Sequence, residues 1–143
     1  MKKVFEAVDR FKNGYACSQA IFSVYGQALG IEHEEAMGIA SGFAGGMRLG
    51  ETCGAVTGAF MVLGRRYWTA EGENQNERTK VYEKVKAFTA MFEKRNKTIV
   101  CKKLLGCDIS TPEGLKTAQE QDLFNTVCTK LVQDAAEIIE EII

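Results

Sequence analysis

Hydrophobic residues recur at helical spacing along most of the chain, with polar and charged residues between them. Near the start, such a stripe is formed by Val4, Phe5, Val8 and Phe11. A long central stripe is formed by Val81, Val85, Phe88 and Phe92. The last is formed by Val127, Leu131, Ala135, Ile138 and Ile142. Apolar positions three or four residues apart predict amphipathic helices that bury one face.

The pattern predicts helices over residues 2–11, 16–29, 30–46, 51–68, 78–96, 98–106 and 124–143. The pair Gly45-Gly46 is a stop signal, and residues 69–77 form a polar loop. Ser110 or Thr111 is expected to cap a short helix that begins at Pro112, where proline is tolerated. No segment alternates with the period of two that strands require. We therefore expect an all-α protein, a single-domain compact bundle of about six to eight helices over residues 1–143.

Charge and hydropathy exclude several classes of protein. The net charge of −1 offers no general attraction for nucleic acid or an anionic membrane. No apolar run approaches the ~18 to 20 residues that span a bilayer. Charged residues interrupt the first residues before a signal-peptide core can form. We expect a cytoplasmic protein with no nucleic-acid partner and no membrane insertion.

The chain has five cysteines, an odd number. Without an export signal, this number argues against a structural disulfide framework and leaves metal binding, redox chemistry or burial. Cys17, Cys53, Cys101 and Cys128 each fall in a different predicted helix, unlike the close pairs of zinc fingers or thioredoxin-type sites. Their spacing leaves open whether the bundle brings the four sulfur atoms together.

The segment GETCGAVTGAF places three glycines four residues apart around one cysteine, at Gly50, Gly54 and Gly58. A second stripe on the preceding predicted helix is formed by Gly38, Gly42 and Gly46. Glycines at this spacing share one helix face and let another backbone or a ligand approach closely. We expect the helices that carry the two stripes to cross at short distance.

The same glycines leave the sulfur of Cys53 sterically open. If Thr52 is the N-cap, Cys53 lies in the first helical turn, where unpaired N–H groups favour a thiolate and lower the pKa below about 8.5. The region around Cys101 is also basic, with Lys97, Lys102 and Lys103. These lysines would lower the pKa of Cys101, or would simply form a solvated helix face.

The motif Cys53-Gly54-Ala55-Val56-Thr57-Gly58, with Cys17 before it and Cys101 and Cys128 after it, resembles a known family. This is the family of small redox-active proteins named for a C–GCAxxG–C–C pattern, and the resemblance extends over nearly the whole chain. It implies that the four cysteines are the functional residues. It implies no defined reaction, and Cys107 falls outside the pattern. Related modules in larger electron-transfer proteins keep a cluster-binding role open.

Three hypotheses follow. In the first, a thiol-based oxidoreductase uses Cys53 as its nucleophile and Cys17, Cys101 or Cys128 as the resolving thiol, with a redox partner protein or a small thiol as its partner. Gly54 and Gly58 would then clear room for a cofactor or substrate. In the second, the same four cysteines bind an iron–sulfur cluster or zinc. In the third, the chain is a non-catalytic helical interaction domain, such as a homodimer, with buried thiols.

Overall fold

The structure is a computed structural model that describes residues 1–68 and 75–143. Within these residues the chain forms eight α-helices: α1 (Lys2–Lys12), α2 (Cys17–Ala28), α3 (His33–Ala40), α4 (Gly54–Tyr67), α5 (Gln75–Asn96), α6 (Cys101–Leu105), α7 (Pro112–Glu120) and α8 (Thr129–Ile142). Three shorter turns are η1 (Ser41–Phe43), η2 (Gly46–Gly50) and η3 (Phe124–Cys128). No strand is found in the described part of the chain, so the prediction of an all-α bundle is confirmed.

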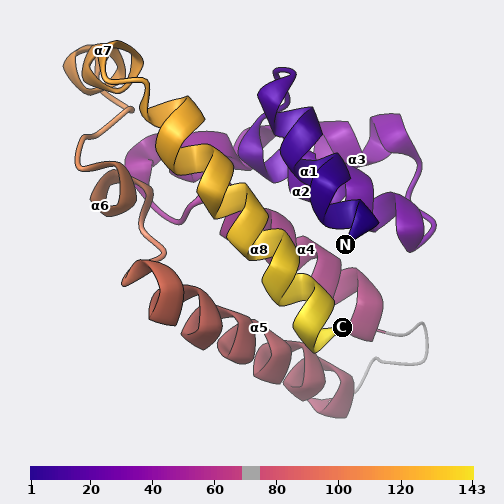
Figure 1. Cartoon of the computed structure of the whole chain (residues 1–143). Coiled ribbons are helices and arrows are strands. Elements are labelled where there is room, and N and C mark those ends of the chain that lie inside the picture. The colour runs from indigo at the N-terminus through magenta and orange to yellow at the C-terminus, as the bar shows by residue number, and fades with distance from the viewer. Residues whose placement is uncertain (69–74) are drawn as a thin grey trace.

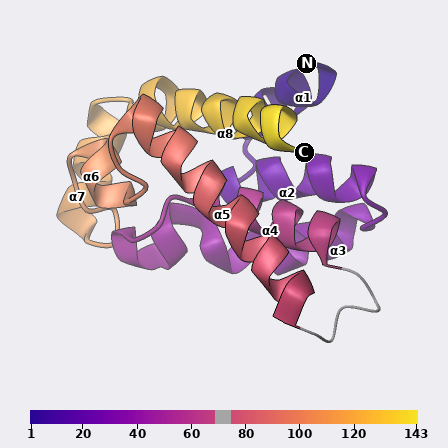
Figure 2. The same ribbon diagram turned by 90° about the horizontal axis from the view of Figure 1, so that it is seen from below.

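Helix α8 lies along the middle of the bundle, with α5 on one side and α1 on the other (Figure 1). Helices α2 and α4 pack against each other and both contact α8. The short helices α6 and α7 lie together at one end of the molecule (Figures 1 and 2). Both chain termini lie near the opposite end of α8, where the Met1 amine is 4.0 Å from the Glu140 carboxylate.

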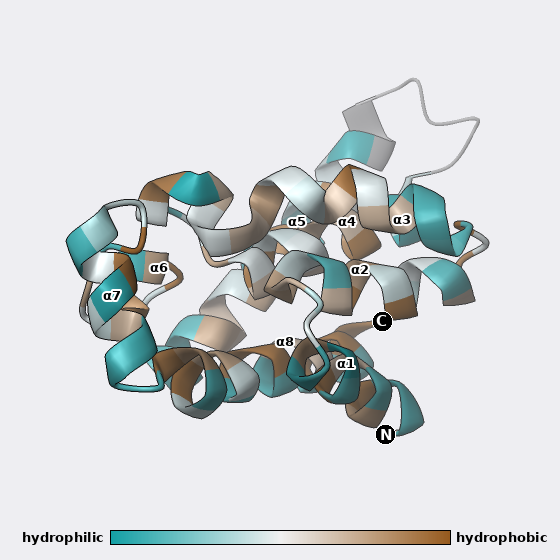
Figure 3. Ribbon diagram, turned by 90° about the horizontal axis from the view of Figure 1, so that it is seen from above, coloured by the Kyte–Doolittle hydropathy of each residue, from teal (hydrophilic) through white to brown (hydrophobic). Residues whose placement is uncertain are grey.

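The buried residues form two hydrophobic clusters. The larger lies between α1, α2, α4, α5 and α8, and its fully buried side chains include Ile21, Leu63, Phe88, Phe92 and Ile138. The smaller lies around α6 and α7 and contains Cys101, Leu105, Ile109 and Ala118. Figure 3 shows the matching pattern on the ribbon, with hydrophilic colour over much of α7 and hydrophobic segments along α8.

Most predicted helix boundaries agree with the structure within a few residues. Thr111 accepts a hydrogen bond from the Gly114 amide at 3.0 Å, and Pro112 is the first residue of α7, as predicted. The polar loop is only partly described, because residues 69–74 lie outside the described residues and α5 already begins at Gln75. No helix in the described residues is long and apolar enough to cross a membrane.

Two predictions about the helices are wrong, one on packing and one on length. Phe5 is 74% exposed, because Val4, Ala7 and the partly buried Val8 and Phe11 already cover the inward face of α1. The helix predicted over residues 30–46 is also shorter. It ends at Ala40, where the narrow turn η1 follows, and the backbone becomes left-handed at Gly45, with φ of 64°.

Candidate functional site

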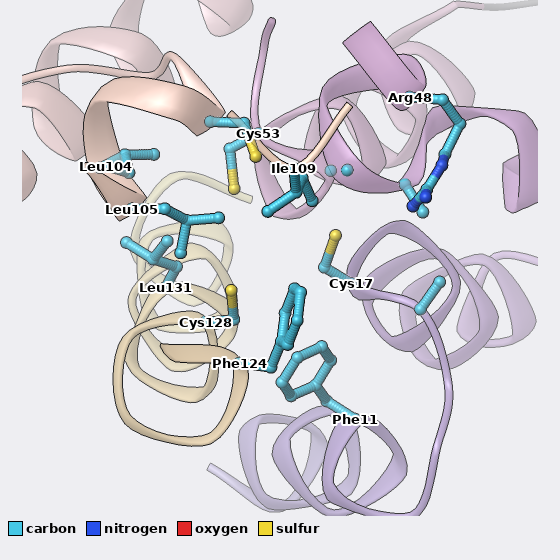
Figure 4. A pocket seen from close by; sticks show the side chains of 15 residues that line it. Phe11, Cys17, Arg48, Cys53, Leu104, Leu105, Ile109, Phe124, Cys128 and Leu131 are labelled. Carbon is cyan, nitrogen blue, oxygen red and sulfur yellow. The ribbon is translucent and has the colours of Figure 1, made fainter. Parts of the chain in front are cut away.

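A cavity of about 160 Å³ lies where the two hydrophobic clusters meet. Its walls contain all four cysteines of the predicted site, Cys17, Cys53, Cys101 and Cys128. The sulfur atoms of Cys17, Cys53 and Cys128 point into one space (Figure 4). Cys17 and Cys128 are half-buried, whereas Cys53 and Cys101 are 5% and 7% exposed. All five cysteines of the chain are free thiols in this structure.

A short backbone ladder holds Cys53 beside Cys101. The Cys53 amide donates to the Ile99 carbonyl at 2.7 Å, and the Cys101 amide donates to the Glu51 carbonyl at 2.5 Å. Between them, Thr52 and Val100 form an isolated antiparallel β-bridge. The prediction that Thr52 caps α4 is therefore wrong: Thr52 is held in the bridge, and Cys53 is the N-cap residue.

Cys17 is held next to Cys53 by the close packing of α2 against α4. A β carbon at Gly54 would overlap the Cys17 sulfur, and one at Gly58 would lie 3.0 Å from the Ser18 carbonyl oxygen. Both glycines therefore serve a close helix crossing, as expected. The partner is α2, however, and not the preceding helix, because a β carbon at Gly38 or Gly42 would meet nothing within 4 Å.

Gly50 has a different role from the one predicted. It lies outside α4 with φ of 68°, and a β carbon there would lie 2.8 Å from a carboxylate oxygen of Asp108. This glycine therefore serves a left-handed backbone position and a close approach to the loop before α7.

Cys128 reaches the cavity from a widened helical turn. Residues 124–128 form the π-helical segment η3, which continues directly into α8 and places Phe124 and Cys128 in the cavity wall. Phe11 of α1 lines the same cavity, and Figure 4 draws its ring next to that of Phe124. Insertions of this type occur frequently at functional sites because they shift the direction of side chains along a helix.

Burial dominates the acidity of these thiols. Desolvation raises the pKa of Cys17 and raises the pKa of Cys53 well above its usual value. The same effect raises the pKa of Cys101 to about 11 and that of Cys128 to about 12. Negative charge on neighbouring cysteines adds to the rise at Cys53, Cys101 and Cys128.

The predicted low pKa of Cys53 is therefore wrong, although the proposed cause exists. The amides of Ala55 and Val56, at the start of α4, do lower its pKa, but loss of water around the sulfur has the larger effect. The site thus holds its cysteines as neutral thiols at neutral pH.

Cys17 has the most hydrogen-bond support for a thiolate. Four backbone groups, at Gly45, Ser18, Cys17 itself and Gly54, lower its pKa against the larger effect of burial. Cys17 as a residue is half-buried, but loss of water around its sulfur remains the larger effect, so the pKa of the thiol is raised in spite of these donors.

Arg48 is a cavity residue that the sequence did not single out. Its side chain lines the cavity together with the cysteines, and its positive charge lowers the pKa of Cys101. None of the lysines near Cys101 in the sequence lines the cavity, and Lys102 pairs with Glu51 at 3.3 Å. The Gly45-Gly46 pair was the only sequence signal for the turn that carries Arg48.

Cys107 packs beside the cavity without lining it. It contacts the smaller hydrophobic cluster, and its charge contributes to the raised pKa of Cys101 and Cys128. The single histidine, His33, lies away from the cavity wall and faces Tyr15, with 3.4 Å between its Nε2 and the tyrosine hydroxyl.

The four cysteines do not form a site for a single metal ion. Among the described residues, no group of three or more histidine, cysteine, aspartate or glutamate side chains is placed so that it could hold a metal ion. A zinc site needs its four thiolates around one ion, whereas in an iron–sulfur cluster the thiolates bind different irons and lie farther apart.

The fold and the site together define a class: a small helical protein in which four cysteines from distant parts of the chain share one cavity. Residues 15–142 match the family described as "Putative redox-active protein (C_GCAxxG_C_C)", and the chain belongs to this family. Comparisons with curated proteins and with solved structures gave no match.

Proposed function

We propose that the chain carries out thiol–disulfide exchange in this cavity, with Cys17, Cys53, Cys101 and Cys128 as its functional residues. The observation that carries the proposal is that all four line one cavity, where Cys17 and Cys128 are only partly buried as residues. Exchange requires thiols that come close together and a path for the reaction partner. Membership of a family described as redox-active supports the same function.

Cys17 is the favoured attacking thiol. In the proposed reaction its thiolate attacks one sulfur of a disulfide RSSR, forming Cys17–S–S–R and releasing RS⁻, which takes up a proton. Cys53 then attacks the Cys17 sulfur and releases the second RSH. The sum is two cysteine thiols oxidised to one disulfide while RSSR is reduced to two RSH.

Cys53 is the favoured resolving thiol for two reasons. Gly54, its neighbour in sequence, lies against the Cys17 sulfur, and charge on Cys17 is the largest electrostatic contribution to the raised pKa of Cys53. Cys101 and Cys128 line the same space and would accept the disulfide in a further exchange.

The test is disulfide mapping by mass spectrometry after equilibration in glutathione redox buffers. We expect a Cys17–Cys53 disulfide that titrates reversibly, and its loss in Cys17→Ser and Cys53→Ser. Cys107→Ser is the matched control, because Cys107 lies outside the cavity wall. Free-thiol counts that stay unchanged from reducing to oxidising buffer would exclude the proposed function.

A further inference from the structure

Arg48 is the last of four consecutive residues whose backbone is left-handed. Residues 45–48 have φ values of 64°, 65°, 60° and 61°, so four consecutive residues are left-handed. Gly45 and Gly46 adopt this conformation without cost, but Met47 and Arg48 do not, since their β carbons crowd the backbone at positive φ. The turn is closed by a hydrogen bond from the Glu51 amide to the Gly46 carbonyl at 3.1 Å.

This turn directs a cation to the edge of the cavity. The Arg48 side chain folds back over Gly45, where an added β carbon would lie 2.9 Å from Nη1, and it runs toward the space that the Cys17 sulfur enters (Figure 4). Among the described residues, no hydrogen bond or ion pair is made by the Arg48 guanidinium. A guanidinium with free donors matches a carboxylate or another oxyanion, which accepts two of its N–H groups.

The remaining wall limits the size and character of a ligand. Apart from the cysteines and Arg48, the side chains around the cavity are almost all apolar, including Phe11, Ile109 and Phe124. A cavity of about 160 Å³ is close to the roughly 150 Å³ that an apolar cavity needs to hold a molecule the size of benzene. It therefore accommodates about six non-hydrogen atoms.

We propose that Arg48 makes the cavity selective for small sulfur compounds that carry an anionic group. The acid group binds the guanidinium at the edge, and the sulfur enters the apolar space and meets the cavity thiols. This inference rests on the proposed function and names its substrate class. The exchange step is Cys–S⁻ + RSSR → Cys–S–S–R + RS⁻, in which one S–S bond breaks and one forms.

Three small symmetrical disulfides of different charge test the proposal: dithiodiglycolate (anionic), hydroxyethyl disulfide (neutral) and cystamine (cationic). Each half of these probes has about four or five non-hydrogen atoms and fits the cavity. The measurement is the rate at which cavity cysteines form the mixed disulfide, followed by mass spectrometry at low ionic strength for the wild type and for Arg48→Gln.

The comparison uses the wild-type rate divided by the variant rate for each probe, because this ratio cancels differences in probe reactivity. The ratio for the neutral probe reports how Arg48 changes the ionisation of the thiols. We expect the ratio for the anionic probe to be about tenfold larger than the ratio for the neutral probe. The ratio for the cationic probe should be smaller than the ratio for the neutral probe. Arg48→Lys should give an intermediate ratio, since it keeps the charge without the paired donors.

Arg65→Gln is the matched control, because it removes an exposed arginine that does not line the cavity. If it reproduces the effect of Arg48→Gln, the preference arises from net charge and the inference is overturned. Equal ratios for the three probes would also overturn it while leaving the proposed exchange in place. If no probe reacts with any cavity cysteine, the proposed function fails as well.

The wild type provides a measurement that does not depend on folding of the variant. Raising the salt concentration screens an exposed guanidinium, so the anionic probe should slow relative to the neutral one. A ratio of the two rates that does not change with salt would contradict recognition by Arg48.

Discussion

The Cys17 sulfur and Gly54 pack against each other where α2 and α4 cross. Gly54 lies against the Cys17 sulfur, and the Phe43 carbonyl oxygen and Ser18 amide nitrogen would each be 3.2 Å from a β carbon at this position. Two of these three neighbours are backbone atoms, which cannot move away as a flexible side chain would. The glycine is thus required by packing and by the position of Cys17 together.

Gly54→Ala should therefore destabilise the protein by about 2 kcal/mol, because the added methyl overpacks a rigid contact. Gly64→Ala is the control on the same helix, since a β carbon there meets nothing within 4 Å. That change should stabilise by roughly 0.5–1 kcal/mol. Urea unfolding of both variants measures the difference, and equal stabilities would contradict the packing role of Gly54.

Among single residues, the sequence identifies the four cysteines that line the cavity but not the pKa of their thiols. The four cysteines could be chosen from the motif around Cys53 and its resemblance to a family. The pKa of Cys53 could not be predicted in this way. The sequence indicates the helix amides that favour its thiolate, but the loss of water around the sulfur depends on residues from distant segments. The partner of Gly54 was missed for the same reason.

The left-handed turn of residues 45–48 is the element that the hydrophobic pattern could not predict. Periodicity reports which face of a helix is buried, and it contains no information about a turn in which four residues have positive φ. Gly45 and Gly46 mark the position where the helix stops. Nothing in the side chains of Met47 or Arg48 indicates that they continue the turn in a conformation that glycine prefers.

Replacing Arg48 by glycine should separate stability from function at this element. Arg48→Gly relieves a left-handed conformation of a non-glycine residue and should raise the free energy of unfolding by up to about 1 kcal/mol. The same change removes the cation from the cavity edge, so the advantage of the anionic disulfide should disappear. Thermal unfolding and the exchange assay, run on one sample, measure both. A loss of stability would show that the turn is not strained.

The whole molecule places its site where two hydrophobic clusters meet. Cys17 and Cys53 belong with the larger cluster, and Cys101 and Cys128 with the smaller one around α6 and α7. The all-α architecture follows from local periodicity and was predicted correctly. The division into two clusters was not predicted. It depends on how α6 and α7 pack at the end of the bundle, and no residue pattern within these short helices specifies their packing.

Burial of four thiols at this junction makes the stability of the reduced protein depend on pH. In the unfolded chain a cysteine ionises near 8.5, whereas the pKa of Cys101 in the folded protein is about 11 and that of Cys128 about 12. Above pH 8.5 the unfolded state releases protons that the folded state retains. The contribution of these thiols is therefore complete below about pH 8 and is lost as the pH rises toward 11–12.

We expect the free energy of unfolding of the reduced protein to fall between about pH 8.5 and 10.5. Urea unfolding at a series of pH values measures it, and Cys128→Ala is the comparison, because the difference between the two curves isolates one thiol from lysine and tyrosine ionisation. The curve of the variant should be less steep. Parallel curves would show that Cys128 ionises alike in both states.

The bridge between Thr52 and Val100 has a consequence for the long stretch of chain that it closes. Helices α4 and α5 lie in sequence between the two residues of the bridge. The backbone hydrogen bonds at the bridge therefore hold Cys53 and Cys101 close together at the two ends of this segment. Changes of length in the connection between those two helices would leave the geometry of the sulfur atoms intact. The number of residues that separate two such cysteines is consequently a poor guide to whether they meet.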